Sequence, residues 1–295
     1  MTADPVLRLP EKIRSFLQVL EESGFEAWAV GGSVRDLLRG EMPKDWDFTT
    51  NAAPRDIEAA FLSHGYPAVP TGGGYGTVTV RFEGQPMEVT PYRVDGSSLD
   101  HRHPEEVRLA RSLEEDLCRR DFTINGMACS REGRVVDLFG GLSDLHAGVL
   151  RPIGAGERRF FEDALRILRG FRFSAQLGFR MTGGALDAAE ACGEYLRQVS
   201  AERIWGELKK MLAAEPAEPL SQMGARGILH WILPAYSGKV REGIRRVSAL
   251  NLGPQERVTL RLAILFAQMP FPQAEERLER LRLEGRVRES VLRLL

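Results

Sequence analysis

The stretch GGSVRDLLRGEMPKDWDF, residues 31–48, joins a glycine turn to two aspartates that flank one tryptophan. The apolar run AWAV before it and the segment DWDFTT at its end predict strands, and VRDLLRG between them predicts a short helix. In a strand, residues i and i+2 point to the same face. Asp45 and Asp47 are therefore expected to project together, while Trp46 packs on the opposite, buried face.

Strands and helices continue to alternate around this stretch. Helices are expected at 11–24 and 53–65, strands at 76–82 and 87–93, and a last strand and turn at 133–141. This alternation predicts an α/β N-terminal domain with a mixed sheet and covering helices.

Beyond about residue 150 the strand signals fade. Apolar residues at helical spacing predict amphipathic helices at 162–178, 185–199, 201–214 and 256–268. An all-α region is therefore expected to follow the α/β domain.

Length and composition set further bounds. A chain of 295 residues is long enough for two or three domains, and 43% apolar with 27% charged residues is typical of soluble globular proteins. The N-terminus lacks the apolar core of a signal peptide, and no apolar run approaches membrane-spanning length. Three cysteines outside any zinc or redox motif fit a reducing compartment. A cytoplasmic protein with no membrane partner is expected.

Charge is distributed unevenly along the chain. Residues 1–150 hold 16 Lys+Arg and 24 Asp+Glu, a net charge of −8, whereas residues 151–295 hold 24 and 17, a net charge of +7. An acidic half joined to a basic half is typical of a cation-using catalytic domain joined to one that binds a phosphate backbone. Arginine-rich surface helices without a nucleic-acid partner would give the same charges, so both interpretations stay open here.

A third carboxylate is available to the two aspartates. Glu88 alternates with Met87 and Val89, so it is expected on the open face of a neighbouring strand. Mg²⁺ prefers oxygen ligands and is usually held by one or two carboxylates plus substrate phosphates. Asp45, Asp47 and Glu88 therefore suit phosphoryl or nucleotidyl transfer assisted by two metal ions. A solvated acid is the alternative interpretation of Glu88.

The glycine turn fits the same chemistry. Gly31 and Gly32 follow a strand and precede a helix, where backbone N–H groups are free to face a phosphate. Arg35 lies on the first turn of that helix and would add a positive charge.

Several motifs occur in a fixed order after this stretch: TGGGYGTVTV, EVTPYR, SLEEDLCRRDFTINGMA, DLFGGLSDL and EDALRILRGFRFSAQLGF. With GGSVRD and DWDF, they resemble the bacterial class II tRNA nucleotidyltransferase/poly(A) polymerase family over roughly residues 25–210. The resemblance implies a nucleotidyltransferase head at 1–142, a helical neck that recognises the base at 143–205, and a helical body with the start of a short or truncated tail at 206–295. It also implies addition of CMP and AMP to the 3′ end of tRNA from CTP and ATP, without a nucleic-acid template.

The resemblance also assigns residues. Asp45 and Asp47 would hold Mg²⁺, and Glu88, expected beside them from strand alternation, would complete the catalytic carboxylates. The nucleotide-binding positions would be Gly31, Gly32, Ser33, Arg35, Arg120, Asp121, Asn125, Asp163, Arg166, Arg169 and Arg172.

The residue types at the neck fit base recognition. Asp163 and Arg166 would share a face of one helix, and a carboxylate accepts hydrogen bonds whereas a guanidinium donates them. Cytosine and adenine present an amino donor beside a ring-nitrogen acceptor, which this pair would match, while uracil and guanine present the opposite pattern. An ordinary surface ion pair is the alternative interpretation.

Three features depart from the family or bear on the product. Tyr75 stands where the family usually has a histidine, so that histidine is expected to be dispensable. The loop at 94–116 looks full length, which favours CCA addition or terminal A addition over CC addition. The chain stops where relatives usually continue, so either a minimal tail or a truncation is expected.

The sequence leaves the product and the assembly open. CC, A and full CCA addition are all compatible with the motifs, as is poly(A) polymerase activity, and the oligomeric state is undetermined. A non-catalytic RNA-binding protein is disfavoured because the three carboxylates are intact. A fused phosphohydrolase is rejected because the helical half has no His-Asp pair.

Overall fold

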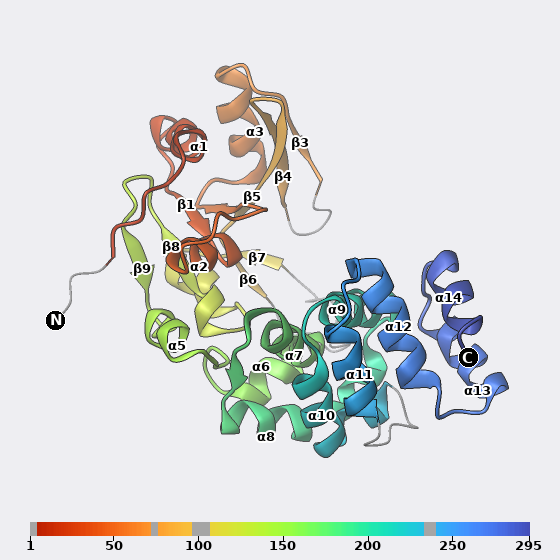
Figure 1. Ribbon diagram of the computed structural model, residues 1–295. Helices are drawn as coiled ribbons and strands as arrows, with labels where there is room; N and C mark the ends of the chain where they lie inside the picture. The colour runs from red at the N-terminus through yellow and green to blue at the C-terminus, as the bar shows by residue number, and fades with distance from the viewer. Residues whose placement is uncertain (1–4, 72–75, 96–106, 233–239) are drawn as a thin grey trace. The chain divides into compact units, whose positions relative to one another are not determined.

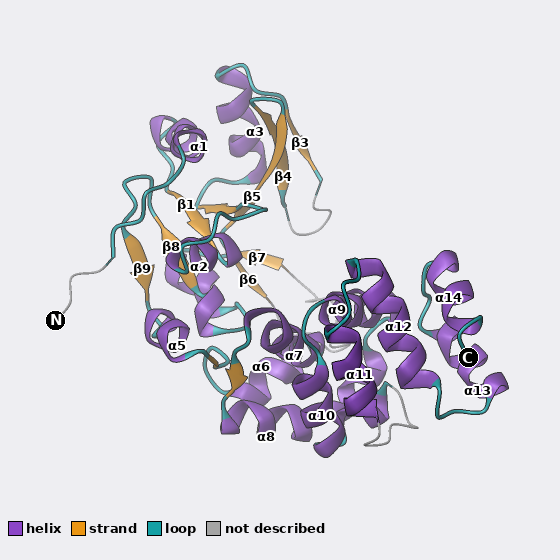
Figure 2. Ribbon diagram, in the orientation of Figure 1, coloured by secondary structure: helices purple, strands orange, loops and turns teal. Residues whose placement is uncertain are grey.

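The computed structural model describes residues 5–71, 76–95, 107–232 and 240–295. They form two compact units, one ending at Ala147 and the other beginning at Gly148. Strands are concentrated in the first unit and helices in the second (Figures 1 and 2). Tyr75 and the centre of the loop expected at 94–116 lie outside the described residues. Within these ranges no helix is long and apolar enough to cross a membrane.

The first unit is built on a seven-stranded sheet with the strand order β3-β4-β5-β2-β1-β8-β9. Strands β2 and β5 are parallel, and the other neighbours are antiparallel, so the sheet is mixed. The strands are β1 (Ala27–Val30), β2 (Asp47–Thr50), β3 (Ala68–Pro70), β4 (Val78–Phe82), β5 (Gln85–Pro91), β8 (Met127–Cys129) and β9 (Val135–Asp137). A separate antiparallel pair consists of β6 (Arg93–Asp95) and β7 (Val107–Leu109).

An aromatic cluster covers one face of this sheet. Phe16 of α1 (Glu11–Glu22) lies with its ring centroid 4.3 Å from that of Phe48 and 4.7 Å from that of Phe61, which belongs to α3 (Pro54–Ser63). Phe82 of β4 meets Phe16 edge to face at 5.2 Å. All four side chains are fully or almost fully buried. The residues of β2 and β5 that alternate with the buried ones, such as Asp47 and Glu88, consequently point away from α1 and α3.

The described residues of the first unit also form the short helical segments α2 (Gly32–Leu38), α4 (Leu113–Cys118), the 3₁₀ turn η2 (Thr123–Asn125) and α5 (Gly141–Ala147). Leu117 of α4 packs with Val30 of β1 and Ala128 of β8 in a buried cluster. This packing fixes the segment that follows α4 against the ends of β1 and β8.

The second unit is helical. Its helices are α6 (Gly156–Glu162), α7 (Leu165–Leu177), α8 (Gly183–Ala191), α9 (Ala201–Ala213), α10 (Ala217–Ala225), α11 (Val240–Ser248), α12 (Pro254–Phe266), α13 (Phe271–Arg280) and α14 (Gly285–Leu292), with 3₁₀ turns η3 (Gly193–Gln198) and η4 (Ile228–Trp231). The expected fold class is confirmed: an α/β unit with a mixed sheet precedes a helical one. The boundaries expected at 142 and 205 stay predictions.

Some expected elements are placed differently. The strand expected from Asp45 begins at Asp47, because Asp47 pairs with Val30, the last residue of β1, and the chain turns at Gly31. Asp45 therefore has no partner on that strand. The helix expected at 185–199 ends at Ala191 and continues as a 3₁₀ turn. The short parallel pair β10 (Val149–Leu150) and β11 (Arg180–Met181) was not expected.

Candidate active site

Two of the three predicted carboxylates are direct neighbours in the sheet. Asp47 and Glu88 are register partners on the parallel strands β2 and β5, so their side chains leave the same face, and both are exposed. Asp45, also exposed, lies two residues before Asp47 in a bend. The indole of Trp46 stacks on Phe48 with 6.3 Å between centroids. Trp46 thus packs toward the aromatic core as expected, but it is half-buried rather than buried.

These carboxylates are suitable ligands for a hard cation. Asp47 and Glu88 are on an open face, and on its other side Glu88 is paired with Thr79 of β4. Within the described part of the chain, no three His, Cys, Asp or Glu side chains gather closely enough to hold a metal ion by themselves. Two carboxylates whose metal is completed by substrate oxygens are the arrangement that Mg²⁺ usually adopts. The donor set therefore fits a metal held jointly by protein and substrate.

The glycine turn lies against this carboxylate pair. Gly31 has a φ of 73°, a left-handed conformation that glycine adopts without strain. A Cβ on Gly31 would lie 3.0 Å from Nη1 of Arg120 and 3.8 Å from Oδ2 of Asp47. The turn, a guanidinium and a carboxylate thus converge within a few ångströms. A side chain at this position would fill the space between them.

A buried hydrogen-bond network fixes the start of α2. Nη1 of Arg35 donates to Oδ1 of Asn125 at 2.8 Å, and Nδ2 of Asn125 donates to Oδ1 of Asp121 at 3.1 Å. All three residues are buried. The hydroxyl of Ser33 donates to the carbonyl of Val30, and Gly32 lies against Arg35. The structure therefore brings these five predicted positions together around one turn.

Asp116 supports the same group of residues and was not among the predicted site residues. Its fully buried carboxylate accepts from Arg119 at 2.8 Å and from Arg120 at 3.1 Å. Burial raises the pKa of this carboxyl, but the charges of Arg120 and Arg119 outweigh burial, and the pKa lies below its ordinary value. The i, i+3 and i+4 spacing of Asp116, Arg119 and Arg120 was the available sequence signal.

In the second unit, the expectation that Asp163 and Arg166 share one helix face is wrong. Asp163 lies between α6 and α7 in an extended conformation, with φ −152° and ψ 103°. Its Oδ1 accepts from the backbone N–H of Leu165 at 3.1 Å, which gives the backbone an alternative to the helix. Its Oδ2 accepts from Nη2 of Arg203 on α9 at 2.7 Å.

The three predicted arginines of α7 have different surroundings. Arg166 is buried and donates to Oε2 of Glu162 at 3.0 Å. Arg169 is half-buried, and its guanidinium lies 5.5 Å from the ring centroid of Phe173. Arg172 is buried against Glu207 of α9. Arg172 is therefore joined to a neighbouring helix, and Arg166 to the helix that precedes it.

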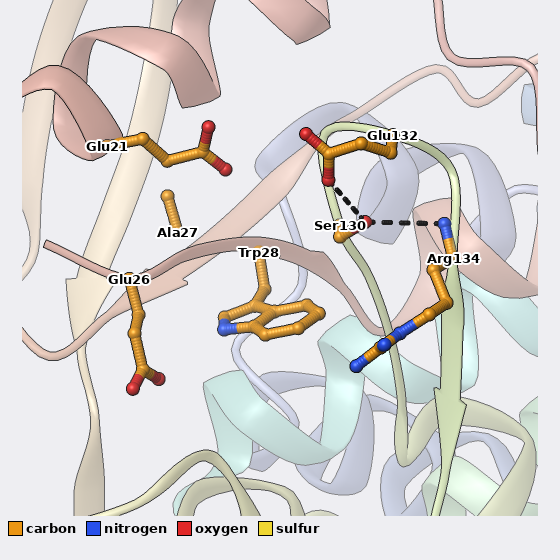
Figure 3. Close-up of a pocket in the computed structure, with 7 residues that line it drawn as sticks. All are labelled: Glu21, Glu26, Ala27, Trp28, Ser130, Glu132 and Arg134. Carbon is orange, nitrogen blue, oxygen red and sulfur yellow. Dashed lines mark hydrogen bonds between the residues drawn. The ribbon is translucent and has the colours of Figure 1, made fainter.

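A separate hollow of about 430 Å³ lies beside β1 and is lined by Glu21, Glu26, Ala27, Trp28, Ser130, Glu132 and Arg134 (Figure 3). None of these residues belongs to the predicted site. Its acids have partners within the protein, since Glu132 accepts from Ser130, Glu21 from Arg131 and Glu26 from Tyr92. The hollow and the predicted site therefore share no residue, and the acids of the hollow are already hydrogen-bonded within the protein.

Comparisons with known proteins point in one direction. Residues 27–151 match the family described as "Poly A polymerase head domain", and residues 178–239 match "Probable RNA and SrmB- binding site of polymerase A". The chain is 40% identical over 232 residues to a CCA-adding enzyme of Leuconostoc mesenteroides, a match that covers 78% of this chain and 57% of that enzyme.

Solved structures give the same result. The structure of the Bacillus stearothermophilus CCA-adding enzyme in complex with CTP is similar with a TM-score of 0.80 and 32% identity, over 95% of this chain and 67% of that one. A tRNA nucleotidyltransferase complexed with a primer tRNA and an incoming ATP analog is similar with a TM-score of 0.77 and 28% identity, over 94% and 82%. The chain spans less than two thirds of the length of the first curated relatives it matches.

Proposed function

Because this chain belongs to the tRNA nucleotidyltransferase/poly(A) polymerase family, we propose that it adds CMP and AMP to the 3′ end of tRNA from CTP and ATP without a template. The observation that carries the proposal is the pairing of Asp47 with Glu88 on an open sheet face, beside the Gly31 turn and Arg120. Carboxylates next to backbone N–H groups and a guanidinium suit transfer of a nucleotidyl group.

The carboxylates would hold a divalent metal, which we propose is Mg²⁺. Asp45 and Asp47 would be its protein ligands, and Glu88 would complete the carboxylate set from the adjacent strand. When bound, the metal would supply activation of the attacking 3′ oxygen and neutralisation of the phosphates. The open position of these side chains is what a ligand set shared with a nucleotide needs.

The triphosphate would lie along the Gly31 turn. The N–H of Gly31 donates to the carbonyl of Met127 at 3.2 Å, so the expectation that both glycine N–H groups are free is wrong for Gly31. Gly32 would present its backbone N–H at the start of α2, Gly31 would leave room for the phosphates because it has no side chain, and Arg120 would contribute a positive charge within reach of the same point. Arg35 and Asp121 are both hydrogen-bonded to Asn125 and all three are buried, so we assign them to shaping the nucleotide-binding turn as well as to contacting the nucleotide. Ser33 would fix the helix through its bond to Val30.

Base choice would depend on the second unit. Both oxygens of Asp163 accept an N–H bond, and a carboxylate has lone pairs left to accept another. Asp163 would accept from the amino group that cytosine and adenine share, and Arg166 would donate to the neighbouring ring nitrogen. Arg169 and Arg172 would support this surface. Uracil and guanine would oppose donor to donor and acceptor to acceptor.

The relatives support the substrates. They include CCA-adding enzymes, one of the solved structures contains CTP, and another contains a primer tRNA with an ATP analog. We extend these substrates to this chain as part of the proposal, with tRNA as its macromolecular partner and the cytoplasm as its compartment.

The test is the length of the product. The full chain is incubated with a tRNA transcript that ends at its discriminator base, together with CTP, ATP and Mg²⁺. Growth by three nucleotides that then stops, and that a chelator abolishes, is expected. No growth at all, or a long ladder with ATP alone as a poly(A) polymerase would give, would overturn the proposal.

A further inference from the structure

Asp163 is held by a residue that no motif singled out. Nη2 of Arg203, near the start of α9, donates to Oδ2 of Asp163 at 2.7 Å across 40 residues of sequence. The side chains of Asp163 and Arg203 are 24% and 31% exposed, so the pair is largely shielded from solvent. With the N–H of Leu165 bound to the other oxygen, the carboxylate is fixed from two sides.

Arg203 lies on a face of α9 that contacts α7 and the segment just before it, which contains Asp163. Glu207 lies four residues after Arg203, hence on the same face of the helix, and it pairs with the buried Arg172 of α7. Two ion pairs therefore join α9 to the segment 163–172, and α9 supplies the cation in one and the anion in the other. Such an arrangement sets the direction in which the Asp163 carboxylate points, independently of Arg166, which donates to Glu162.

We propose that Arg203 is a positioning residue for base selection. It orients the Asp163 carboxylate so that its remaining lone pairs accept from the amino group of cytosine or adenine. The inference rests on the proposed function and names a residue that acts through Asp163 and not by touching the base. Without Arg203 the carboxylate is held on one side only, by the N–H of Leu165. A less constrained acceptor discriminates less well between an amino group and a carbonyl.

The experiment measures kcat/KM for CTP, ATP, UTP and GTP on tRNA primers with the full chain. Arg203→Gln removes the charge and keeps most of the side-chain length, while Arg203→Lys keeps the charge. We expect Arg203→Gln to lower the preference for CTP over UTP and for ATP over GTP by on the order of tenfold. Arg203→Lys should restore part of it. These ratios do not depend on the fraction of folded enzyme, so loss of stability alone leaves them unchanged.

A double variant shows whether Arg203 acts through Asp163. If it does, adding Arg203→Gln to Asp163→Ala should not reduce the preference further, because neighbours that act as a unit are not additive. Arg226→Gln is the matched control, since Arg226 pairs with Asp187 and Glu190 of α8, away from Asp163. Its ratios should equal those of wild type.

The possible outcomes distinguish failure of the positioning role from failure of the proposed function. Wild-type selectivity in Arg203→Gln, with the enzyme active, would overturn the positioning role and leave the proposed function intact. An additive loss in the double variant would also overturn it. A wild-type chain that incorporated neither C nor A would overturn the proposed function, and the positioning role with it.

Discussion

Asp47 begins β2, with Val30 opposite it on one neighbouring strand and Glu88 on the other. Asp47→Asn removes the charge of a proposed metal ligand, so we expect the rate of nucleotide incorporation to fall at least about a hundredfold, which corresponds to about 2.7 kcal/mol of transition-state stabilisation. Asp45→Asn should act in the same direction. Because both side chains are exposed, thermal unfolding should be nearly unchanged.

Asp56→Asn provides the control for these variants. Asp56 is an exposed acid on α3, the helix that packs on the opposite face of the sheet through Phe61. It should retain wild-type activity. Near-normal metal-dependent activity in Asp47→Asn would show that the carboxylate assignment is wrong.

The buried Asp116 carboxylate should make the stability of the protein depend on pH. The pKa of Asp116 in the folded protein lies below the ordinary pKa of an aspartate. Its carboxylate therefore stabilises the fold at every pH above the ordinary pKa, and this stabilisation is lost as the pH falls through the lowered pKa. Asp116→Asn should cost about 3 kcal/mol at neutral pH, because Arg119 and Arg120 lose a buried partner.

Denaturant unfolding of wild type and Asp116→Asn between neutral pH and about pH 2.5 checks this. The difference in the free energy of unfolding between the two proteins should narrow as the pH drops below about 4, where carboxyl groups ordinarily take up a proton. A gap that stays constant down to the lowest pH would contradict the proposed charge pairing.

At the level of secondary-structure elements, the C-terminus of α9 is capped by an arginine from another helix. The fully buried Arg261 of α12 donates through Nη1 to the carbonyls of Leu212, at 2.6 Å, and Ala214, and through Nη2 to Ser248 at 2.7 Å. The last carbonyls of a helix have no partner within it, and a cation there is favoured by the helix dipole. Arg261 therefore replaces a local C-cap.

Arg261→Met keeps the apolar stem and removes these donors. We expect unfolding in urea to show a loss of about 2–4 kcal/mol, since buried carbonyls are left unsatisfied. Arg246→Met, in an exposed i, i+4 pair with Glu242, should change stability by less than about 0.5 kcal/mol. Equal effects from the two substitutions would exclude the capping role.

The elements also show what local sequence determines. Alternation placed Glu88 on an open strand face, and the register with Asp47 agrees with the expectation of a neighbouring strand. A single helix was expected through Asp163 because the helical spacing of apolar residues continues through this position. In the structure the Asp163 carboxylate accepts from the N–H of Leu165, and the helix is interrupted there. Arg203 could not be found from spacing, since its partner lies 40 residues away and only helix packing joins them.

For the whole molecule, the two units carry different parts of the proposed chemistry. The acidic half of the chain contains the carboxylates and Arg120, and the basic half, with a net charge of +7, contains Asp163 and Arg203. A basic surface is suited to a tRNA backbone, and an acidic site is suited to metal ions. Under the proposed function, the first unit would supply the groups for transfer and the second unit the side chains for base selection.

The most direct test of this account gives the full chain three tRNA primers, ending in the discriminator base, in C, and in CC, with each of the four nucleoside triphosphates alone. We predict CMP addition to the first two primers, AMP addition to the third, and little incorporation of UMP or GMP on any of them. AMP addition to all three primers regardless of their ends, or equal use of UTP and CTP, would contradict it.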